Sequence, residues 1–382
     1  MKISRIETLI VFAQWRNWVL VKISTDDGLT GWGEATVEGR EQAVAAAVKE
    51  VGRRLEGRNP LDVEALYQLM SRGSFWRGGV ILSSAVSGLE QALWDLSGKH
   101  YGIPVYRLLG GPCRQRVPVY ASGWIQPGDD SIDKLVARAR LTVEEGYRAL
   151  KTPCFLPGDD IVGRPMLERG LDLVKELRKA LGDGIEIMVE LHGRFSFDLA
   201  RLAVQRLQAF EPAWIEEPCG PQHHENLKLL SQESRCPLAA GERLFSRHGF
   251  WPLIRDRAAS VIQPDLCHVG GLWEARKLAA MAEVRDILVA PHNPLSPLST
   301  AACMHLAIST PNFLVLELVP RDVDWREELF PHRPYRFQDG DLLCNDAPGL
   351  GITVDEEVAA AHPYQPVDLP VLRTREGAHA DW

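Results

Sequence analysis

Short apolar runs and helical repeats alternate along most of this chain. From about residue 117 onward, eight apolar runs of strand length are separated by segments in which apolar residues recur at helical spacing. The runs cover residues 117–121, 149–154, 186–191, 213–217, 238–242, 261–266, 287–292 and 313–318. The helices predicted between them include residues 165–181, 199–210, 272–282 and 298–309. Eight strands separated by helices predict an α/β fold whose parallel sheet closes as a TIM barrel, in preference to an open doubly wound sheet.

The first 116 residues follow a different pattern. Strand-like runs at residues 3–12, 18–24 and 30–34 lie close together, and a turn signal at residues 25–28 predicts an antiparallel meander. Helical patterns follow at residues 41–55 and 81–99. We therefore expect an α+β domain over residues 1–116 and the barrel over residues 117–319. The tail, about 320–382, reads as mostly irregular, and we expect it to return to the first domain and complete it.

Composition narrows the class of protein. Of 382 residues, 45% are hydrophobic and 25% are charged, which is typical of a globular domain. The net charge of −8 comes without a basic arm or stripe, so we expect no nucleic-acid partner. Because no segment has the apolar length of a membrane span, we also expect no membrane partner. Seven scattered cysteines, odd in number and never in a C-x-x-C pair, favour reduced thiols and a cytoplasmic location.

Three acidic residues stand near the ends of consecutive predicted strands. Glu190, Glu216 and Glu242 are each separated by 26 residues, about one strand-helix unit. In a TIM barrel the carboxyl ends of the strands form the active-site face, so these side chains should stand side by side. Converging carboxylates repel one another unless a cation lies between them, and hard oxygen ligands select Mg²⁺. For any one of them alone, a solvated rim or a structural ion pair is the more ordinary interpretation.

Two histidines flank this acidic set. Asp265 and His292 lie at the ends of the next two predicted strands, and a carboxylate beside an imidazole suits a general base. His192 follows Glu190 by two residues, so on an extended chain both side chains point to the same side. Either histidine alone is more often structural. Together with a divalent ion, one imidazole can take the proton next to a substrate carboxylate, and the other can protonate a leaving hydroxyl. The product would be a 2-keto-3-deoxy acid.

Ordered motifs along nearly the whole chain resemble the enolase superfamily, its mandelate racemase subgroup, and most closely the bacterial D-galactonate dehydratases. The motifs are Gly31-Trp32-Gly33-Glu34, Arg77-Gly78-Gly79, Gln91-Ala92-Leu93-Trp94-Asp95, His192-Gly193-Arg194, Ile215-Glu216-Glu217-Pro218, Ala239-Ala240-Gly241-Glu242-Arg243, Gln263-Pro264-Asp265-Leu266, Ala290-Pro291-His292 and Pro348-Gly349-Leu350-Gly351.

The resemblance implies a capping domain over a modified (β/α)7β barrel, with Mg²⁺ at the three glutamates. It implies that the His292–Asp265 dyad takes the carbon-2 proton and that His192 assists loss of the 3-hydroxyl. Glu317 would help to stabilise the enediolate. It also implies a small acid-sugar substrate and a homo-oligomer. The chain departs from the family pattern at Glu190, where Asp is usual, and at Pro153, where the galactonate enzymes usually have Asn.

Other residues are candidates for substrate binding. We predict this role for Lys151, Arg194, Arg243, Arg77 and Trp18, since guanidinium and ammonium groups suit carboxylates and hydroxyls. A structural salt bridge is the alternative for each arginine. Three other functions stay open from the residues: an epimerase or cycloisomerase on the same scaffold, an aldolase forming a Schiff base at Lys151, and a homologue that has lost catalysis.

Overall fold

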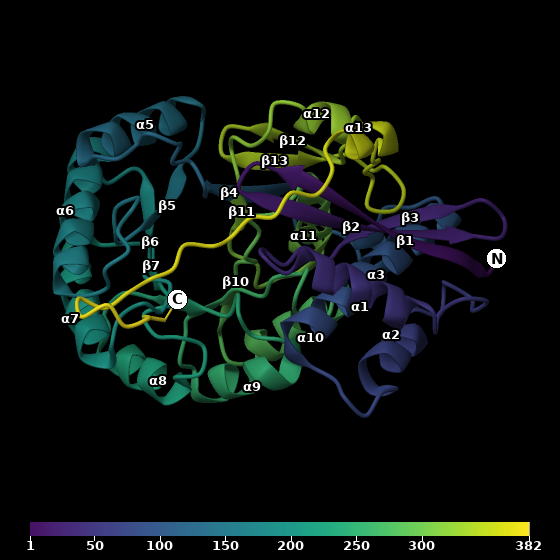
Figure 1. Ribbon diagram of the computed structural model, residues 1–382, viewed down its shortest axis with the longest axis horizontal. Coiled ribbons are helices and arrows are strands. Elements are labelled where there is room, and N and C mark those ends of the chain that lie inside the picture. The colour runs from purple at the N-terminus through teal and green to yellow at the C-terminus, as the bar shows by residue number, and fades with distance from the viewer. Residues whose placement is uncertain (382) are drawn as a thin grey trace.

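The computed structural model describes residues 1–381 and begins with the predicted antiparallel meander. Its strands pair in the order β1-β2-β3, and helices α1 to α4 follow them. The elements are β1 (Ile3–Ala13), β2 (Arg16–Thr25), β3 (Thr30–Glu34), α1 (Glu41–Gly52), α2 (Val63–Arg72), α3 (Gly79–Tyr101) and α4 (Val105–Leu108). Helix α3 ends at Gly102, whose φ of 68° is left-handed and is adopted readily by glycine. The elements from β1 to α4 together form the first segment of the chain, which lies beside the barrel (Figure 1).

The second part alternates strands and helices as predicted. The strands are β4 (Arg116–Ala121), β5 (Ala149–Pro153), β6 (Glu186–Glu190), β7 (Trp214–Glu216), β8 (Leu238–Ala240), β9 (Val261–Ile262), β10 (Leu288–Val289) and β11 (Leu316–Leu318). The helices are α5 (Ile132–Glu144), α6 (Arg164–Leu181), α7 (Phe197–Leu207) with the 3-10 turn η1 (Gln208–Phe210), α8 (His224–Glu233), α9 (Ser246–Asp256), α10 (Leu272–Glu283) and α11 (Pro297–Ser309). Several strands are shorter than the apolar runs that predicted them, because the runs continue into loops at the carboxyl ends.

Parallel pairing closes these strands into a ring. Strands β4 to β10 pair in sequence order, β11 pairs with β4, and a bridge between Val289 and Phe313 joins the remaining gap. One side chain from each of the eight strand segments fills the interior as a single buried cluster. These are Tyr120, Ala149, Met188, Trp214, Ala239, Val261, Ala290 and Val315. The predicted TIM barrel is therefore confirmed, with a packed interior.

The tail contains more regular structure than the sequence indicated. It forms α12 (Arg326–Leu329), β12 (Tyr335–Gln338), β13 (Asp341–Cys344) and α13 (Glu356–Ala361). The β12–β13 hairpin adds antiparallel to β4, so this part of the tail joins the barrel sheet. Beyond it, the chain returns to the first domain, where the backbone N–H of Phe12 donates to the carbonyl of His362. The last segment then crosses the molecule toward α7 (Figure 1).

Buried acids of the first segment accept hydrogen bonds from the N-termini of two barrel helices. Glu34 accepts from the backbone N–H groups of Ser296 and Ser299 at the start of α11. Glu90, on α3, accepts from the N–H groups of Leu272 and Trp273 at the start of α10. Helix N-termini carry unpaired N–H groups and partial positive charge, so carboxyl groups there hold the two parts together.

Replacing Glu34 with Ala is expected to destabilise the protein by about 2–4 kcal/mol, because several buried donors lose their acceptor. Burial raises the pKa of Glu34 to about 7, although the Ser296 and Thr36 hydroxyls donate to it. The measurement is urea denaturation followed by circular dichroism. The matched control is Glu233→Ala, which removes an exposed ion pair to Arg201 and should change stability by less than about 1 kcal/mol. Equal effects of the two substitutions would contradict the role of Glu34.

Over the described residues, no helix has the length and apolarity that crossing a membrane requires. The boundaries of the two domains, near residues 116 and 319, stay a prediction.

Candidate active site

The barrel interior determines which side chains reach the carboxyl-end face. Side chains alternate between the two faces of a strand, so the residue two positions after an interior residue points inward again. Five titratable residues stand two positions after members of the interior cluster. They are Lys151, Glu190, Glu216, His292 and Glu317. The strand periodicity therefore aims these groups into one space above the packed interior.

Three carboxylates meet there. Glu190, Glu216 and Glu242 each offer an oxygen, and these oxygens lie within 4.8 Å of one another. Glu190 and Glu216 end β6 and β7, whereas Glu242 lies two residues beyond β8. Burial, and then the neighbouring Glu216, raise the pKa of Glu190 well above its ordinary value. The sequence-predicted acidic set is thus brought together, in a geometry that a divalent cation can occupy.

The extra methylene of Glu190 is accommodated by a folded side chain. Its Oε1 accepts a hydrogen bond of 2.6 Å from the backbone N–H of His192. Among the described residues, no donor hydrogen-bonds to the other oxygen, Oε2, although it is buried. A buried carboxylate oxygen without a hydrogen bond is costly, and a metal ion is the kind of partner that removes this cost.

Lys151 lies at the centre of the acidic groups. Its Nζ is 2.8 Å from Glu216 Oε1, 2.9 Å from Glu317 Oε1 and 3.8 Å from Glu190 Oε2. Burial alone would lower the pKa of Lys151, but Glu216 and Glu317 raise it well above its ordinary value. Likewise burial would raise the pKa of Glu216, and Lys151 lowers it. Lys151 is therefore held as an ammonium ion, suited to bind an anionic substrate group beside the carboxylates.

The predicted dyad is formed. His292 Nδ1 lies 2.7 Å from Asp265 Oδ2, and the other ring nitrogen, Nε2, lies 3.7 Å from Glu242 Oε2. The imidazole therefore points from a buried carboxylate toward the acidic set. Burial would lower the pKa of His292, but Glu242, Glu317 and Asp265 raise it to about 10. The negative charge of these three carboxylates thus favours the protonated form of the His292 ring.

His192 reaches the site by a different route from the one expected. The extended chain assumed for residues 190–192 was wrong, because His192 has a φ of 50°, in the left-handed region. Its carbonyl accepts a hydrogen bond of 3.2 Å from Arg243, and its ring lies 5.7 Å from that of Phe155. Burial, followed by the charge of Arg194, lowers the pKa of His192 well below its ordinary value. The two imidazoles thus sit in opposite electrostatic environments.

The substrate-binding candidates separate into two groups. Arg194 and Arg243 follow His192 and Glu242, and they lie close to the acidic set. Arg194 stacks on Phe155 at 3.7 Å, and Arg243 pairs with Glu217 at 2.6 Å. Trp18 is instead fully buried, 6.0 Å from Trp325 and 5.9 Å from Phe330 by ring centroids. Arg77 lies in an exposed loop that lines a cavity of about 900 Å³ between the first segment and the barrel.

Sequence reasoning did not single out several residues that order the site. Trp214 Nε1 donates to Glu216 Oε2 at 2.8 Å, and the N–H of Asn293 donates to Glu317 Oε2 at 2.8 Å. His268 Nε2 lies 3.6 Å from Asp265 Oδ2. For Trp214 a signal existed, because it precedes Glu216 by two residues and so shares its face of the strand. His268 is beyond the strand, and only the folded loop shows what it faces.

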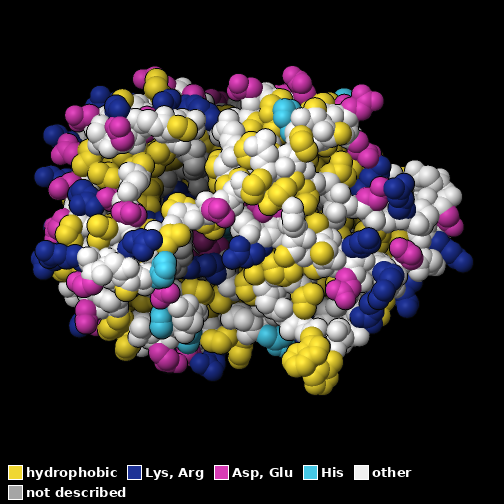
Figure 2. Space-filling view, in the orientation of Figure 1, with side chains coloured by type: hydrophobic (Ala, Val, Ile, Leu, Met, Phe, Trp, Pro, Cys, Tyr) yellow, Lys and Arg dark blue, Asp and Glu magenta, His cyan; other side chains and the backbone are white. Residues whose placement is uncertain are grey.

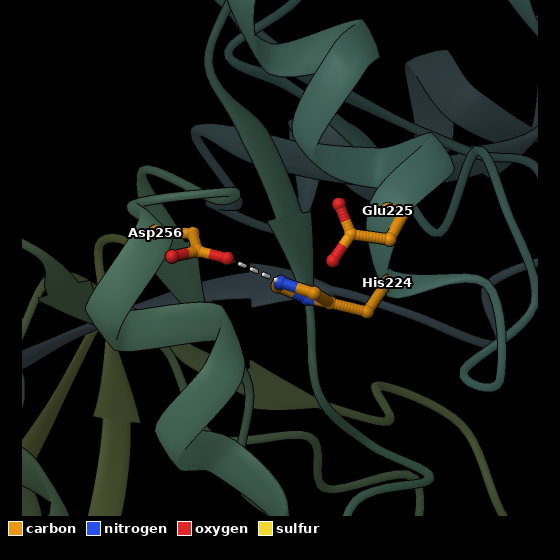
Figure 3. Close-up of side chains that lie close together, drawn as sticks. All are labelled: His224, Glu225 and Asp256. Carbon is orange, nitrogen blue, oxygen red and sulfur yellow. Dashed lines mark hydrogen bonds and ion pairs between the residues drawn. The ribbon is translucent and has the colours of Figure 1, made fainter.

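A second cluster lies on the outside of the barrel. His224, Glu225 and Asp256 come from α8 and α9, and Figure 3 shows the imidazole of His224 directed at Asp256. His224 Nε2 and Asp256 Oδ2 are 2.9 Å apart. Asp256 also pairs with Arg255 at 2.8 Å and with Lys228 at 3.4 Å. Because bases already neutralise Asp256, this cluster is a surface ion-pair network that joins two helices.

Figure 2 shows that the face crossed by the last segment is hollowed, with acidic and basic side chains visible inside the hollow. The mixed charge of this face agrees with the spread of charge along the sequence.

Comparison with known proteins adds to this geometry. Residues 6–110 match the mandelate racemase/muconate lactonizing enzyme N-terminal domain, and residues 134–358 match the enolase C-terminal domain-like family. A D-galactonate dehydratase of Pectobacterium atrosepticum is 36% identical, with all of both chains covered. A mandelate racemase/muconate lactonizing enzyme from a Sulfitobacter species is 33% identical, with a TM-score of 0.91 and complete coverage of both chains. An enolase from Pantoea ananatis, solved with bound D-gluconate and Mg, is 29% identical, with a TM-score of 0.91 and 99% of each chain covered.

Proposed function

The chain belongs to the mandelate racemase/muconate lactonizing enzyme family of the enolase superfamily, and we propose that it dehydrates an aldonate such as D-galactonate with Mg²⁺. Relatives named as dehydratases cover its whole length, and it is a sugar-acid dehydratase, a hydro-lyase. The finer proposal names the metal, the substrate and the residues that act. The single observation that carries it is the convergence of three carboxylates and the His292–Asp265 dyad in one buried space.

Glu190, Glu216 and Glu242 would hold the metal. The fit rests on three oxygen donors within 4.8 Å of one another, and on the buried Glu190 oxygen to which no described donor hydrogen-bonds. Hard oxygen donors of this kind suit Mg²⁺. When bound, Mg²⁺ would acidify the carbon beside the substrate carboxylate and offset the negative charge around His292.

His292 is proposed to take the proton from carbon 2. Its Nε2 faces the acidic set, while Asp265 holds Nδ1 and so fixes the tautomer with a free lone pair on Nε2. As this proton leaves, charge develops on the substrate carboxylate oxygens. The Lys151 ammonium and Glu317 border that position, and they would orient the carboxylate and stabilise the enediolate.

His192 is proposed to assist departure of the 3-hydroxyl. The C2–H and C3–O bonds are broken, a C2–C3 double bond forms, and the hydroxyl leaves as water with a proton passed from His192. The resulting enol becomes the 2-keto-3-deoxy acid. Arg194 and Arg243 would bind the hydroxyls farther along the substrate, and Arg77 would act from the first segment, whereas Trp18 is fully buried against Trp325 and Phe330 and is not proposed to contact substrate.

The test of this function is a library of aldonates and aldarates incubated with the protein and Mg²⁺. The expected result is a 2-keto-3-deoxy acid from at least one aldonate, detected by a carbonyl reagent and by NMR. Carbon-2 deuterium exchange without any keto acid would indicate an epimerase or cycloisomerase instead. Borohydride trapping at Lys151 would indicate a Schiff-base aldolase. No turnover of any member would indicate a homologue that has lost catalysis.

Removal of metal is expected to abolish activity, which EDTA followed by dialysis tests directly. Re-addition of Mg²⁺ should restore turnover, and it should also stabilise the fold by about 2.7 kcal/mol when its concentration is 100 times Kd. Glu216→Gln should weaken Mg²⁺ binding at least about 10-fold by calorimetry. The surface variant Glu225→Gln, in the outer cluster, serves as the matched control and should bind Mg²⁺ as the unaltered protein does. Full activity of the chelated protein would contradict the metal assignment.

We also propose that the protein acts in the cytoplasm as a homo-oligomer, without a nucleic-acid partner. The unpaired cysteines and the exposed Phe75 and Trp76 rings, at 88% and 79% exposure, support this proposal. Light scattering coupled to gel filtration measures the oligomeric state, and a single monomeric peak would contradict the proposed homo-oligomer.

A further inference from the structure

A third imidazole lies behind the dyad. Asp265 Oδ2 faces two rings: His292 Nδ1 at 2.7 Å and His268 Nε2 at 3.6 Å. The other oxygen, Oδ1, accepts from the backbone N–H of Cys267 at 2.6 Å. Asp265 is fully buried and His268 is 7% exposed, so protein groups surround this carboxylate. His268 therefore occupies one of the few positions from which a side chain can orient Asp265.

The other side of His268 contacts the first segment. Its Nδ1 lies 2.9 Å from the hydroxyl oxygen of Ser84 on α3. The Ser84 hydroxyl donates its proton to the carbonyl of Val80, one turn earlier in the helix. Since a serine hydroxyl has a single proton, its oxygen is left to accept from His268 Nδ1–H, and only the doubly protonated ring then offers Nε2–H to Asp265, as an ion pair at 3.6 Å. His268 is thus fixed between a helix of the first segment and the dyad carboxylate.

One face of α3 fixes the whole loop that carries His268. Ser84, Ser87 and Gln91 recur at helical spacing and point the same way. Ser87 Oγ accepts from the N–H of Gly270 at 2.9 Å, and Gln91 Nε2 donates to the carbonyl of Leu266 at 2.9 Å. The loop between β9 and α10 is therefore held in register by α3 on both sides of His268.

We propose that Ser84 and His268 form a positioning link that orients Asp265 and thereby sets the aim of His292. The link makes the competence of the base depend on the docking of α3 against the barrel. His268 is a positioning residue, since it acts through Asp265 and Asp265 acts through His292. The inference rests on the proposed function, because it takes the dyad as the base that removes the carbon-2 proton.

The first experiment replaces His268 with Leu and with Gln, and Ser84 with Ala. His268→Leu is expected to slow carbon-2 deuterium exchange about 10- to 100-fold, the usual effect of losing a residue that orients a catalytic group. KM and the Kd for Mg²⁺ should change little, because the carboxylates and Lys151 are untouched. His268→Gln retains an N–H donor and should recover part of the rate, and Ser84→Ala should give a smaller loss.

A double-mutant cycle separates positioning from general stability. If His268 acts through Asp265, then His268→Leu should add little to the loss caused by Asp265→Asn. His305→Leu is the matched control: His305 is also buried, on α11, and its Nδ1 accepts a hydrogen bond from the N–H of Tyr106. It should lower the melting temperature without slowing exchange by the folded protein. If the two substitutions instead slow exchange by independent factors, so that the double variant shows the product of the two single losses, the proposal is overturned.

Proton NMR of the protein without substrate gives a readout independent of turnover. The proton between His292 and Asp265 should give a far-downfield resonance that is shifted or lost in His268→Leu and retained in His305→Leu. If the unaltered protein exchanges no acid sugar, the proposed function fails, and this resonance still tests the link. If it exchanges normally and all three variants at positions 268 and 84 match it in rate and resonance, only the positioning link fails. Should His268→Leu not fold, His268→Gln and Ser84→Ala carry the same test.

Discussion

Replacing His292 with Asn should eliminate carbon-2 deuterium exchange and turnover together, with a loss of about 10³–10⁴-fold in kcat. Asn is similar in size and keeps a polar contact with Asp265, but it cannot accept a proton near neutral pH. His292 Nε2 is directed at the acidic set, 3.7 Å from Glu242 Oε2, so the substitution removes the ring nitrogen that is proposed to take the proton. The measurement is NMR exchange of the carbon-2 proton in D₂O, with Mg²⁺ present.

The control for this substitution is His224→Asn in the outer cluster. His224 also pairs with an aspartate, Asp256, but it lies on α8 outside the barrel. Its replacement should leave exchange unchanged. If the His292→Asn protein still exchanges the carbon-2 proton, the base is another residue and the assignment of the dyad is contradicted.

Replacing His192 with Asn should stop dehydration and leave carbon-2 exchange. A loss of about 10²–10³-fold in keto-acid formation is expected, because the leaving hydroxyl no longer receives a proton. Exchange should continue because His292, Asp265 and the three carboxylates are untouched. Both rates are measured on one sample, by the carbon-2 proton signal and by keto-acid formation.

The ratio of the two rates is the informative quantity for His192. Loss of exchange with retention of dehydration, the reverse pattern, would exchange the roles of the two histidines. Equal loss of both rates, with Mg²⁺ binding also weakened, would show that the substitution disturbs the turn at residue 192 that holds Glu190 in place.

Opposite electrostatic environments surround these two rings. Glu242, Glu317 and Asp265 surround His292 and raise its pKa, whereas Arg194 and Lys151 act with burial to lower that of His192. His292 therefore holds its proton more tightly and His192 less tightly, so the proposed roles of base and acid require bound Mg²⁺ and substrate to change this order. The sequence placed both imidazoles on one face. The opposite shifts of their pKa values come from neighbouring residues on other strands and loops.

Much of the site followed from strand periodicity alone. Because side chains alternate on a strand and parallel strands share their carboxyl end, Glu190 and Glu216 had to project into one space, with Lys151 beside them. That regularity is local, and a single sequence carries it. It also fixed the fold class, since eight strand-helix units of similar length close a barrel. The regular elements of the tail, including the hairpin that pairs with β4, gave no such signal.

What lies beyond the ends of the strands was decided by tertiary structure. The left-handed turn at His192, the folded side chain of Glu190 and the contact from Ser84 to His268 depend on loops whose shape is set by distant partners. A loop has no periodicity, and its hydrogen bonds go to whatever the rest of the chain brings near. The sequence thus determined which chemical groups face the site, and the packing of α3 and the barrel loops decided how each of them is aimed.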